Sequence, residues 1–213
     1  MQHTLLSIGK KQMKIKKFLI NMIPFAKLRR RMREYLYPQN TNLKKLYAEN
    51  NIASGVRLSN PENIELGGKV YIGEDCRFYA EGGIKIGAYT KFGQGCIILT
   101  TNHNYKSQTR IPYDNIGLLR RVEIGKNCWI GVRSLICGGV KIDEGAIVAM
   151  GSVVTKSVPK YAIVGGNPAK IIGWRNKEIY ERLSAAGMSY PQDDELPRKW
   201  IREEGFKRYL EEK

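Results

Sequence analysis

Hydrophobic residues recur at every sixth position over the stretch from Ile124 to Val158. The aliphatic positions are Ile124, Ile130, Ile136, Ile142, Val148 and Val154, and the residues four places after them are Cys128, Ser134, Val140, Ala146, Ser152 and Val158. A helix repeats about every 3.6 residues and a flat strand about every 2, so neither places these aliphatic side chains on one face. A coil of short parallel strands does, because each hexamer then forms one flat side with its aliphatic residue pointing inward.

The same alternation of large and small residues continues upstream with less regular spacing. Its large residues are Ile72, Phe78, Ile86, Phe92 and Ile98, with two additional residues between Phe78 and Ile86. Before them, Ile52, Leu58, Ile64 and Val70 keep the interval without small partners, which is typical of a capping coil. The pattern predicts an all-β core, a parallel β-helix over residues 46–175. The six-residue spacing is lost between Ile98 and Ile124, which predicts a loop at 104–121 extruded from the coil.

Both ends of the chain have helical character. Apolar residues follow helical spacing on either side of Pro24, and proline suits the first turn of a helix. The sequence therefore predicts two short amphipathic helices in an N-terminal appendage, residues 1–45. Segments 176–186 and 198–212 also have helical composition, which predicts a C-terminal helical extension over residues 176–213.

The chain carries 36 lysines and arginines against 20 aspartates and glutamates, a formal net charge of +16. This excess favours anionic partners such as nucleic acid, a membrane surface, an acidic glycan or coenzyme phosphates. Much of it lies near the start, where one acid, Glu34, accompanies Lys10, Lys11, Lys14, Lys16, Lys17, Lys27, Arg29, Arg30, Arg31 and Arg33. An RNA-binding motif, a zinc finger and a recognition helix are all missing from the sequence, so we predict no nucleic-acid partner.

The cysteines and histidines restrict the chemistry. Cys76, Cys96 and Cys128 fall at small positions of the repeat and are predicted to be packing residues, which favours a reducing, cytoplasmic compartment. His3 and His103 are the only histidines, too few for the three-histidine zinc site of the β-helical carbonic anhydrases, and we predict no metal. The apolar segment at residues 18–26 lacks a small-residue cleavage site and is too short to span a bilayer.

Several motifs together resemble a known family. The hexapeptide repeats, His103 at the mouth of the loop, NCWIG at 127–131 and GGNPAKIIG at 165–173 are similar to the left-handed β-helix acetyltransferases. The maltose, galactoside and polysaccharide O-acetyltransferase group is the most similar, over about residues 64–175. The resemblance implies a left-handed coil, acetyl-CoA as donor, and a homotrimer with three active sites at subunit interfaces.

Site residues carry over from that family one at a time. His103 takes the position of the catalytic histidine, where a neutral imidazole would act as general base on a hydroxyl too weakly acidic to attack a thioester unaided. The positions that match the family's coenzyme groove are Trp129, Val132, Met150, Thr155, Lys156 and Lys170. The family's second basic position falls on Gly173, and Arg175 two places on is the candidate replacement.

The acceptor side is less sharply defined. Glu81 aligns with the region where related enzymes hold an acceptor hydroxyl, and Tyr105, Tyr113 and Asp114 of the loop are candidates to line the same pocket. The predicted acceptor is a carbohydrate, either a polysaccharide unit or a lipid-linked glycan. Two alternatives stay open: N-acetylation of an amino sugar or antibiotic, and a non-enzymatic β-helix binding protein.

Residues 1–36 allow two interpretations. Their apolar stripe either packs on the coil or a neighbouring subunit, or lies on an anionic membrane surface at the cytoplasmic leaflet. The second interpretation predicts a cytoplasmic protein that is peripheral to the inner face of the membrane.

Overall fold

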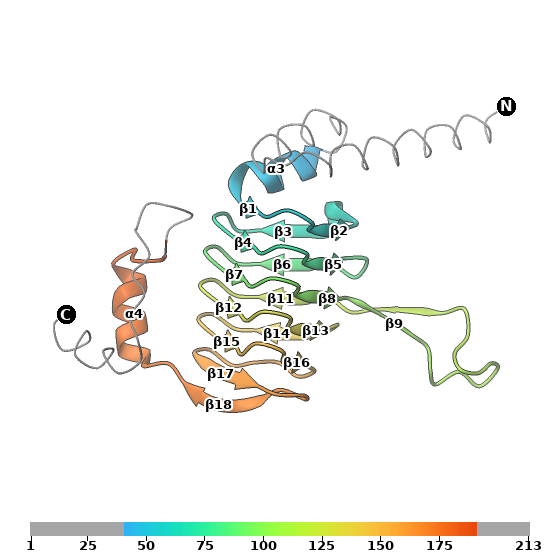
Figure 1. Cartoon of the computed structure of the whole chain (residues 1–213). Helices are drawn as coiled ribbons and strands as arrows, with labels where there is room; N and C mark the ends of the chain where they lie inside the picture. The colour runs from blue at the N-terminus through green and yellow to red at the C-terminus, as the bar shows by residue number, and fades with distance from the viewer. Residues whose placement is uncertain (1–40, 191–213) are drawn as a thin grey trace.

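The computed structural model describes residues 41–190, so the predicted helices around Pro24 and at 198–212 lie outside this range. Helix α3 (Thr41–Glu49) spans the boundary predicted at residue 46 and precedes a stack of coils, with Leu46 and Tyr47 buried against the first coil (Figure 1). The coils form a parallel β-helix with three flat sides, as the repeat predicted.

Each side of the coil is one sheet, and strands of successive coils pair in parallel. Sheet A contains β1 (Asn51–Ile52), β4 (Tyr71–Ile72), β7 (Lys91–Phe92), β12 (Trp129–Ile130), β15 (Ile147–Val148), β17 (Ala162–Gly165) and the antiparallel β18 (Lys170–Trp174). Sheet B contains β2 (Arg57–Ser59), β5 (Arg77–Tyr79), β8 (Ile97–Leu99), β13 (Leu135–Cys137) and β16 (Val153–Val154). Sheet C contains β3 (Ile64–Leu66), β6 (Ile84–Ile86), β11 (Val122–Ile124) and β14 (Lys141–Ile142), and a short 3-10 helix, η1 (Pro61–Asn63), precedes β3.

The repeat residues fill the interior as predicted. All six aliphatic positions between Ile124 and Val154 are buried, and the rings of Phe78 and Phe92 meet at 5.1 Å between centroids. Buried hydroxyls at the corners find carbonyl partners, since Thr90 donates to Gly125 over 2.7 Å and Ser134 donates to Gly131 over 2.8 Å. The cysteines predicted to pack there, Cys76, Cys96 and Cys128, are buried and free.

The corner between sheets B and C is the irregular one. Phe78 and Ile86 are in register with Ile136 and Ile142 through the intervening coil, so the early coil uses 86 − 78 = 8 residues where the later one uses 142 − 136 = 6. The two additional residues noted in the sequence therefore lie at this corner. One coil later the same corner opens into the extruded segment.

The extruded segment is a hairpin rather than an irregular loop. Strands β9 (Thr101–His103) and β10 (Gly117–Leu119) pair antiparallel, and Figure 1 shows them leaving the side of the coil. Thr100 fixes the root, because its hydroxyl donates to the carbonyl of Tyr79 over 2.7 Å and its carbonyl accepts from Arg120 N over 2.8 Å. The hairpin is thereby anchored to the coil above it.

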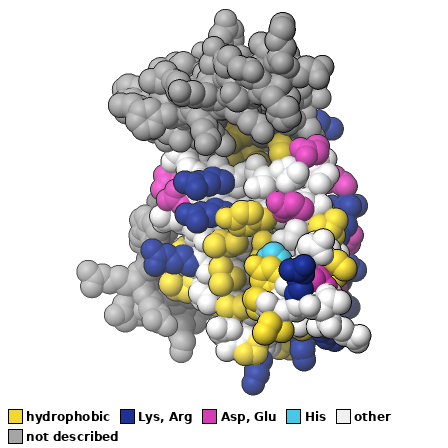
Figure 2. All heavy atoms as spheres, turned by 90° about the vertical axis from the view of Figure 1, so that its right-hand side faces the viewer, with side chains coloured by type: hydrophobic (Ala, Val, Ile, Leu, Met, Phe, Trp, Pro, Cys, Tyr) yellow, Lys and Arg dark blue, Asp and Glu magenta, His cyan; other side chains and the backbone are white. Residues whose placement is uncertain are grey.

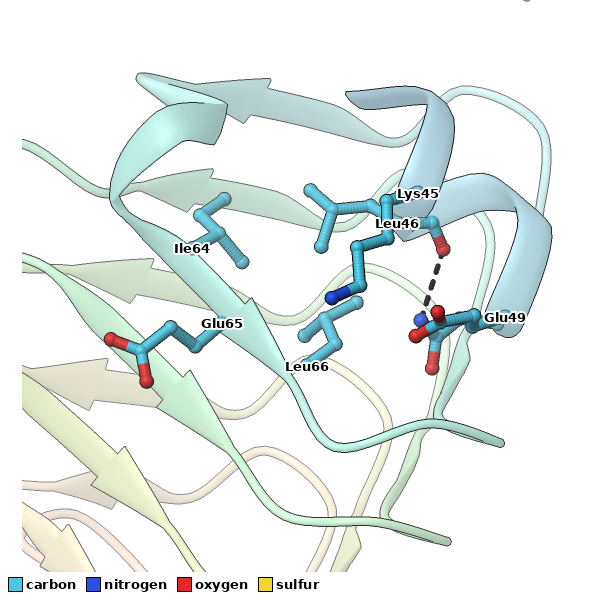
Figure 3. A pocket seen from close by; sticks show the side chains of 7 residues that line it. Lys45, Leu46, Glu49, Ile64, Glu65 and Leu66 are labelled. Carbon is cyan, nitrogen blue, oxygen red and sulfur yellow. Dashed lines mark hydrogen bonds between the residues drawn. The ribbon is translucent and has the colours of Figure 1, made fainter. Parts of the chain in front are cut away.

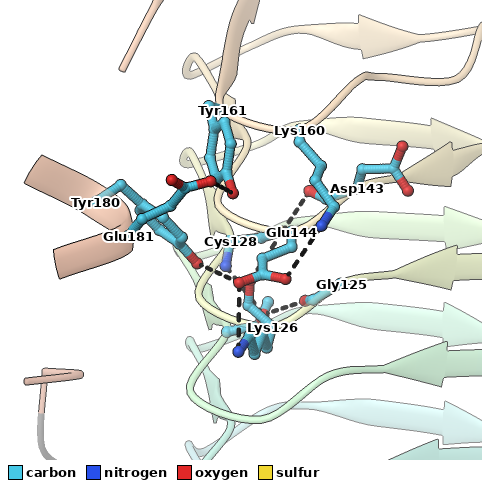
Figure 4. A network of polar contacts seen from close by, with 10 residues as sticks. Gly125, Lys126, Cys128, Asp143, Glu144, Lys160, Tyr161, Tyr180 and Glu181 are labelled. Carbon is cyan, nitrogen blue, oxygen red and sulfur yellow. Dashed lines mark hydrogen bonds and ion pairs between the residues drawn. The ribbon is translucent and has the colours of Figure 1, made fainter. Parts of the chain in front are cut away.

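The predicted C-terminal helix begins one residue later than the sequence indicated, because Asn176 is its cap. The Asn176 side chain accepts from Ile179 N over 2.9 Å and starts α4 (Lys177–Ala185). The Tyr180 hydroxyl donates to Glu144, whose carboxylate also pairs with Lys126 at 3.3 Å and Lys160 at 3.7 Å (Figure 4). Burial is the main cause that raises the pKa of Tyr180, to about 12. This network docks α4 onto the corner between sheets C and A.

Glycines at the same corner permit the close approach of successive coils. A Cβ on Gly87 would lie 2.6 Å from the carbonyl carbon of Gly125, with backbone on both sides of the contact. We predict that Gly87→Ala lowers stability by about 1–3 kcal/mol, the range for forcing added carbon into a packed interior. Gly117→Ala on the hairpin is the control, since its Cβ would meet nothing within 4 Å. Equal thermal midpoints for the two variants would contradict this account of the corner.

Candidate active site

The hairpin brings three of the predicted residues together. The His103 ring stacks on Tyr113 with centroids 3.9 Å apart and planes 9° from parallel, and both side chains are exposed. Asp114 accepts from Asn104 Nδ2 over 2.8 Å and from Ile116 N over 2.9 Å. These hydrogen bonds, the one from Ile116 first, lower the pKa of the Asp114 carboxyl. Asp114 therefore braces the tip of the hairpin, and Tyr113 orients the imidazole.

The imidazole itself is available for chemistry. Within residues 41–190, no hydrogen bond or ion pair engages the ring nitrogens of His103. Tyr105, the remaining predicted hairpin residue, is 61% exposed near the tip. The hairpin thus presents one stacked histidine and two tyrosines to solvent.

Glu81 lies at the root of this hairpin. It occupies the lengthened corner between sheets B and C, and the next residue, Gly82, donates its backbone N–H to Thr100 Oγ1 over 2.8 Å. The Glu81 carbonyl accepts from Asn63 Nδ2 over 3.3 Å, while its carboxylate is exposed. Glu81 is therefore placed on the same corner as His103, one coil earlier.

The first three coenzyme candidates lie elsewhere on the coil. Trp129 projects from the outer face of sheet A, between Lys91 and Ile147, and is 56% exposed. Val132 and Met150 follow at the corner between sheets A and B on successive coils, joined by a hydrogen bond from Gly151 N to the Val132 carbonyl over 2.8 Å. Together they form an exposed apolar surface that runs along the coil.

The four polar coenzyme candidates are not gathered at one point. Thr155 and Lys156 follow β16, whereas Lys170 begins β18 opposite Gly165, and all three are exposed. Arg175 follows the other end of β18, where its guanidinium lies 5.7 Å from the Tyr180 ring centroid. Since a strand rises about 3.3 Å per residue, Lys170 and Arg175 are separated by roughly 16 Å of backbone. Arg175 contacts α4 and does not join Lys170.

Comparison with known proteins supports the interpretation of the coil. Residues 121–156 match the family model described as the hexapeptide repeat of succinyl-transferase. The chain superposes with a TM-score of 0.59 on a maltose O-acetyltransferase from Clostridium difficile, at 24% identity over 81% of this chain and 89% of that one. The chain has the fold of this hexapeptide-repeat protein, a left-handed parallel β-helix. The resemblance stated from the sequence is thereby confirmed.

Further relatives carry acetyltransferase names. The putative colanic acid biosynthesis acetyltransferase WcaF of Escherichia coli is 32% identical over 121 residues, 57% of this chain and 64% of WcaF. A putative acetyltransferase of Staphylococcus aureus is 35% identical over 111 residues, 52% of this chain and 54% of the relative. The chain thus spans between about half and two thirds of the length of these relatives.

The outer faces of this hexapeptide-repeat coil differ in chemistry. Sheet C is lined by charges of alternating sign in register, Glu65, Lys85, Glu123 and Lys141, as expected of a solvated face. Sheet B instead has apolar outward residues on its later coils, Ile97, Leu99, Leu135, Cys137 and Val153. Figure 2 shows these hydrophobic side chains as a column with the histidine beside it. An exposed apolar face of this kind marks an interaction surface.

A cavity of about 140 Å³ lies at the N-terminal end of the coil, between α3 and β3 (Figure 3). Its lining residues are Lys45, Leu46, Glu49, Asn50, Ile64, Glu65 and Leu66. None of the predicted site residues borders it, so it is not the candidate active site. In the described part of the chain, no helix has the length and hydropathy needed to cross a bilayer, and no cluster of potential metal ligands is found.

Proposed function

We propose that this protein is an acetyl-CoA-dependent O-acetyltransferase that acts on a carbohydrate, a polysaccharide unit or a lipid-linked glycan. The observation that carries the proposal is the exposed His103 ring, oriented by Tyr113 on a hairpin that the coil extrudes. A structure of a hexapeptide-repeat acetyltransferase from Vibrio cholerae in complex with acetyl coenzyme A has the same fold, with a TM-score of 0.61 at 22% identity over 78% of this chain and 87% of that one.

The reaction needs one base. The neutral imidazole of His103 takes the proton of an acceptor hydroxyl while its oxygen attacks the thioester carbonyl of acetyl-CoA. The tetrahedral intermediate then collapses, the acetyl group stays on the acceptor oxygen, and the coenzyme leaves as a thiol after taking a proton from the imidazolium. The thioester is already activated, so transfer is direct and no acyl-enzyme forms. Glu81 and the hairpin tyrosines, Tyr105 and Tyr113, hold the acceptor beside this base.

The coenzyme lies along sheet A and the corner between sheets A and B. Trp129, Val132 and Met150 supply the apolar surface for the extended pantetheine arm, and Lys170 supplies a positive charge for the phosphates. Thr155 and Lys156 extend this groove toward the adenine end. Arg175 contributes less in this proposal, because it packs on Tyr180.

One subunit alone does not bring the base to this groove. His103 belongs to the corner between sheets B and C, while Trp129 lies on sheet A and Val132 on the corner between sheets A and B. A homotrimer completes the site when the apolar face of sheet B packs on a neighbour, so that the hairpin of one subunit meets the groove of the next. Such a head-to-tail contact closes into a ring with three equivalent sites.

N-acylation of an amino sugar is the second candidate. A variant of AntD from Bacillus cereus, an N-acyltransferase in complex with dTDP-4-amino-4,6-dideoxyglucose and coenzyme A, shares the fold with a TM-score of 0.55. It is 21% identical and the match covers 66% of this chain and 89% of that one. The direct test of the proposed function measures free thiol released from acetyl-CoA with saccharides and with amino sugars. Release without any saccharide dependence would reject both candidates.

The basic segment at residues 1–36 is proposed to place the enzyme on the cytoplasmic leaflet, near lipid-linked acceptors. Each basic residue near an anionic surface adds about 1 kcal/mol of attraction, and three copies in a trimer would multiply it. We predict that the full-length protein co-sediments with anionic vesicles, is released by high salt, and does not bind neutral vesicles. Deleting residues 1–36 should abolish binding but preserve transfer to a soluble acceptor. Equal recovery with both vesicle types would reject a membrane role.

A further inference from the structure

Two arginines lie side by side on the outer face of sheet B. Arg57 of β2 and Arg77 of β5 are partners in the parallel register, and both side chains are exposed. Strands in a sheet are about 4.8 Å apart, so the two side chains leave the surface as close neighbours. Within the described residues, neither guanidinium has an ion-pair or hydrogen-bond partner.

This pairing contrasts with the rest of the coil. On sheet C every outward basic residue is flanked in register by an acid, as Lys85 is by Glu65 and Glu123. Like charges placed directly opposite each other destabilise a sheet. An anion between Arg57 and Arg77 would remove that repulsion, and two planar guanidinium groups can each offer paired N–H donors to phosphate oxygens.

The arginine pair lies on the acceptor side of the proposed site. Arg77 and Tyr79 project from the same face of β5, about 7 Å apart at two residues of strand rise. Tyr79 in turn holds Thr100, three residues before His103, through its carbonyl. Figure 2 shows basic side chains directly above the hydrophobic column, on the face that also presents the histidine. The arginines and the base therefore flank one continuous surface.

We propose that Arg57 and Arg77 bind the phosphate groups of the acceptor, which is a saccharide carried on a diphosphate. This inference rests on the proposed function and narrows its substrate class. A nucleoside diphosphate sugar and a lipid diphosphate sugar present the same anionic group next to the sugar. The arginines hold that group, and the sugar extends past Tyr79 toward Glu81 and His103.

The first test measures binding alone. Inorganic pyrophosphate is titrated calorimetrically into the full-length protein with coenzyme A present in excess, so that the phosphate-binding part of the coenzyme groove is occupied. The Arg57→Gln/Arg77→Gln variant should bind at least ~10-fold more weakly, the scale of lost hydrogen bonds to a charged group. The control is Lys85→Gln/Lys141→Gln, which removes the same charge from sheet C and should bind like wild type. No binding by wild type, or equal losses in both double variants, would overturn the inference.

The second test separates the two sources of the diphosphate. Acetylation rates are compared for UDP-glucose, citronellyl diphosphate glucose and methyl glucoside. KM for the two diphosphate acceptors should rise at least ~10-fold in the arginine variant, while KM for methyl glucoside should not change. The lower wild-type KM of the two diphosphates identifies the carrier. Equal KM changes for all three acceptors would overturn the inference. Absence of acetyl transfer to any of the acceptors would instead count against the proposed function. In that case the calorimetric experiment still tests whether the arginines bind a diphosphate.

Discussion

Replacing His103 by alanine is expected to lower turnover by about 10²- to 10⁴-fold, the usual contribution of a general base. The affinity for coenzyme A should be nearly unchanged, because the proposed groove of Trp129, Val132 and Met150 lies on another part of the coil. Thermal stability should also be preserved, since the ring is exposed and its contact is the stack on Tyr113. Steady-state kinetics, coenzyme titration and a melting curve on one preparation measure all three quantities.

A matched variant separates the base from its orientation. Tyr113→Leu removes the aromatic stack and keeps the imidazole, so its turnover should fall less than that of His103→Ala. A His103→Ala protein with near wild-type turnover would contradict the assignment of the base. A His103→Ala protein that unfolds would contradict the expectation that His103 contributes little to the stability of the fold.

Replacing Leu135 by aspartate is expected to separate the proposed trimer into subunits and lower activity by about 10²-fold or more, because the proposed base and coenzyme groove then lose their alignment. Leu135 lies at the centre of the apolar face of sheet B, in register with Ile97 and Val153. A charge placed there would be desolvated without a partner on association. Sedimentation velocity gives the assembly state, and the same samples give the activity.

The control introduces the same charge on an exposed apolar residue outside sheet B. Ile179 on α4 is 47% exposed, and Ile179→Asp should leave both assembly and activity close to wild type. Wild-type protein that sediments as an active monomer would contradict the interfacial site. So would a Leu135→Asp protein that dissociates and keeps its turnover.

The interior of the coil could be predicted from the sequence because it depends only on local period. A buried residue every six positions is readable from Ile124 to Val154 without any knowledge of long-range pairing. Helix α4 could be predicted for the same reason, since the segment that begins at Asn176 has helical composition. The extruded segment was predicted from the loss of the six-residue spacing, although its pairing as β9 and β10 depends on contacts that no short pattern carries.

The outer faces could not be read in the same way. Whether Arg57 pairs with Arg77 or with an acidic residue depends on the number of residues per coil. The irregular corner changes that number along the chain. It is 20 between the partners Ile52 and Ile72, and 18 between Ile130 and Val148. One available indication was overlooked: the apolar runs at 97–99 and 135–137 lack the polar alternation of a half-exposed strand, which indicates a sheet covered on both faces.

The separation of His103 and Trp129 on the coil could not be predicted for the same reason. Both residues were identified from motifs, but motifs do not report which corner of the coil each one occupies. Only the register of β8, β9 and β12 shows that the hairpin and Trp129 belong to different parts of the coil. The proposal of a site shared between subunits therefore rests on the fold and not on any single stretch of sequence.

The most direct test of the central claim identifies the bond that the proposed reaction forms. Purified protein is incubated with acetyl-CoA and a saccharide that has hydroxyl groups but no free amine, and both the thiol released and the acetylated saccharide are quantified. The account predicts one thiol per acetylated saccharide, a product whose acetyl group is removed by mild alkali as an ester, and loss of both in His103→Ala. Absence of thiol release with this saccharide, together with release and an alkali-stable amide product in a parallel incubation with an amino sugar, would contradict it.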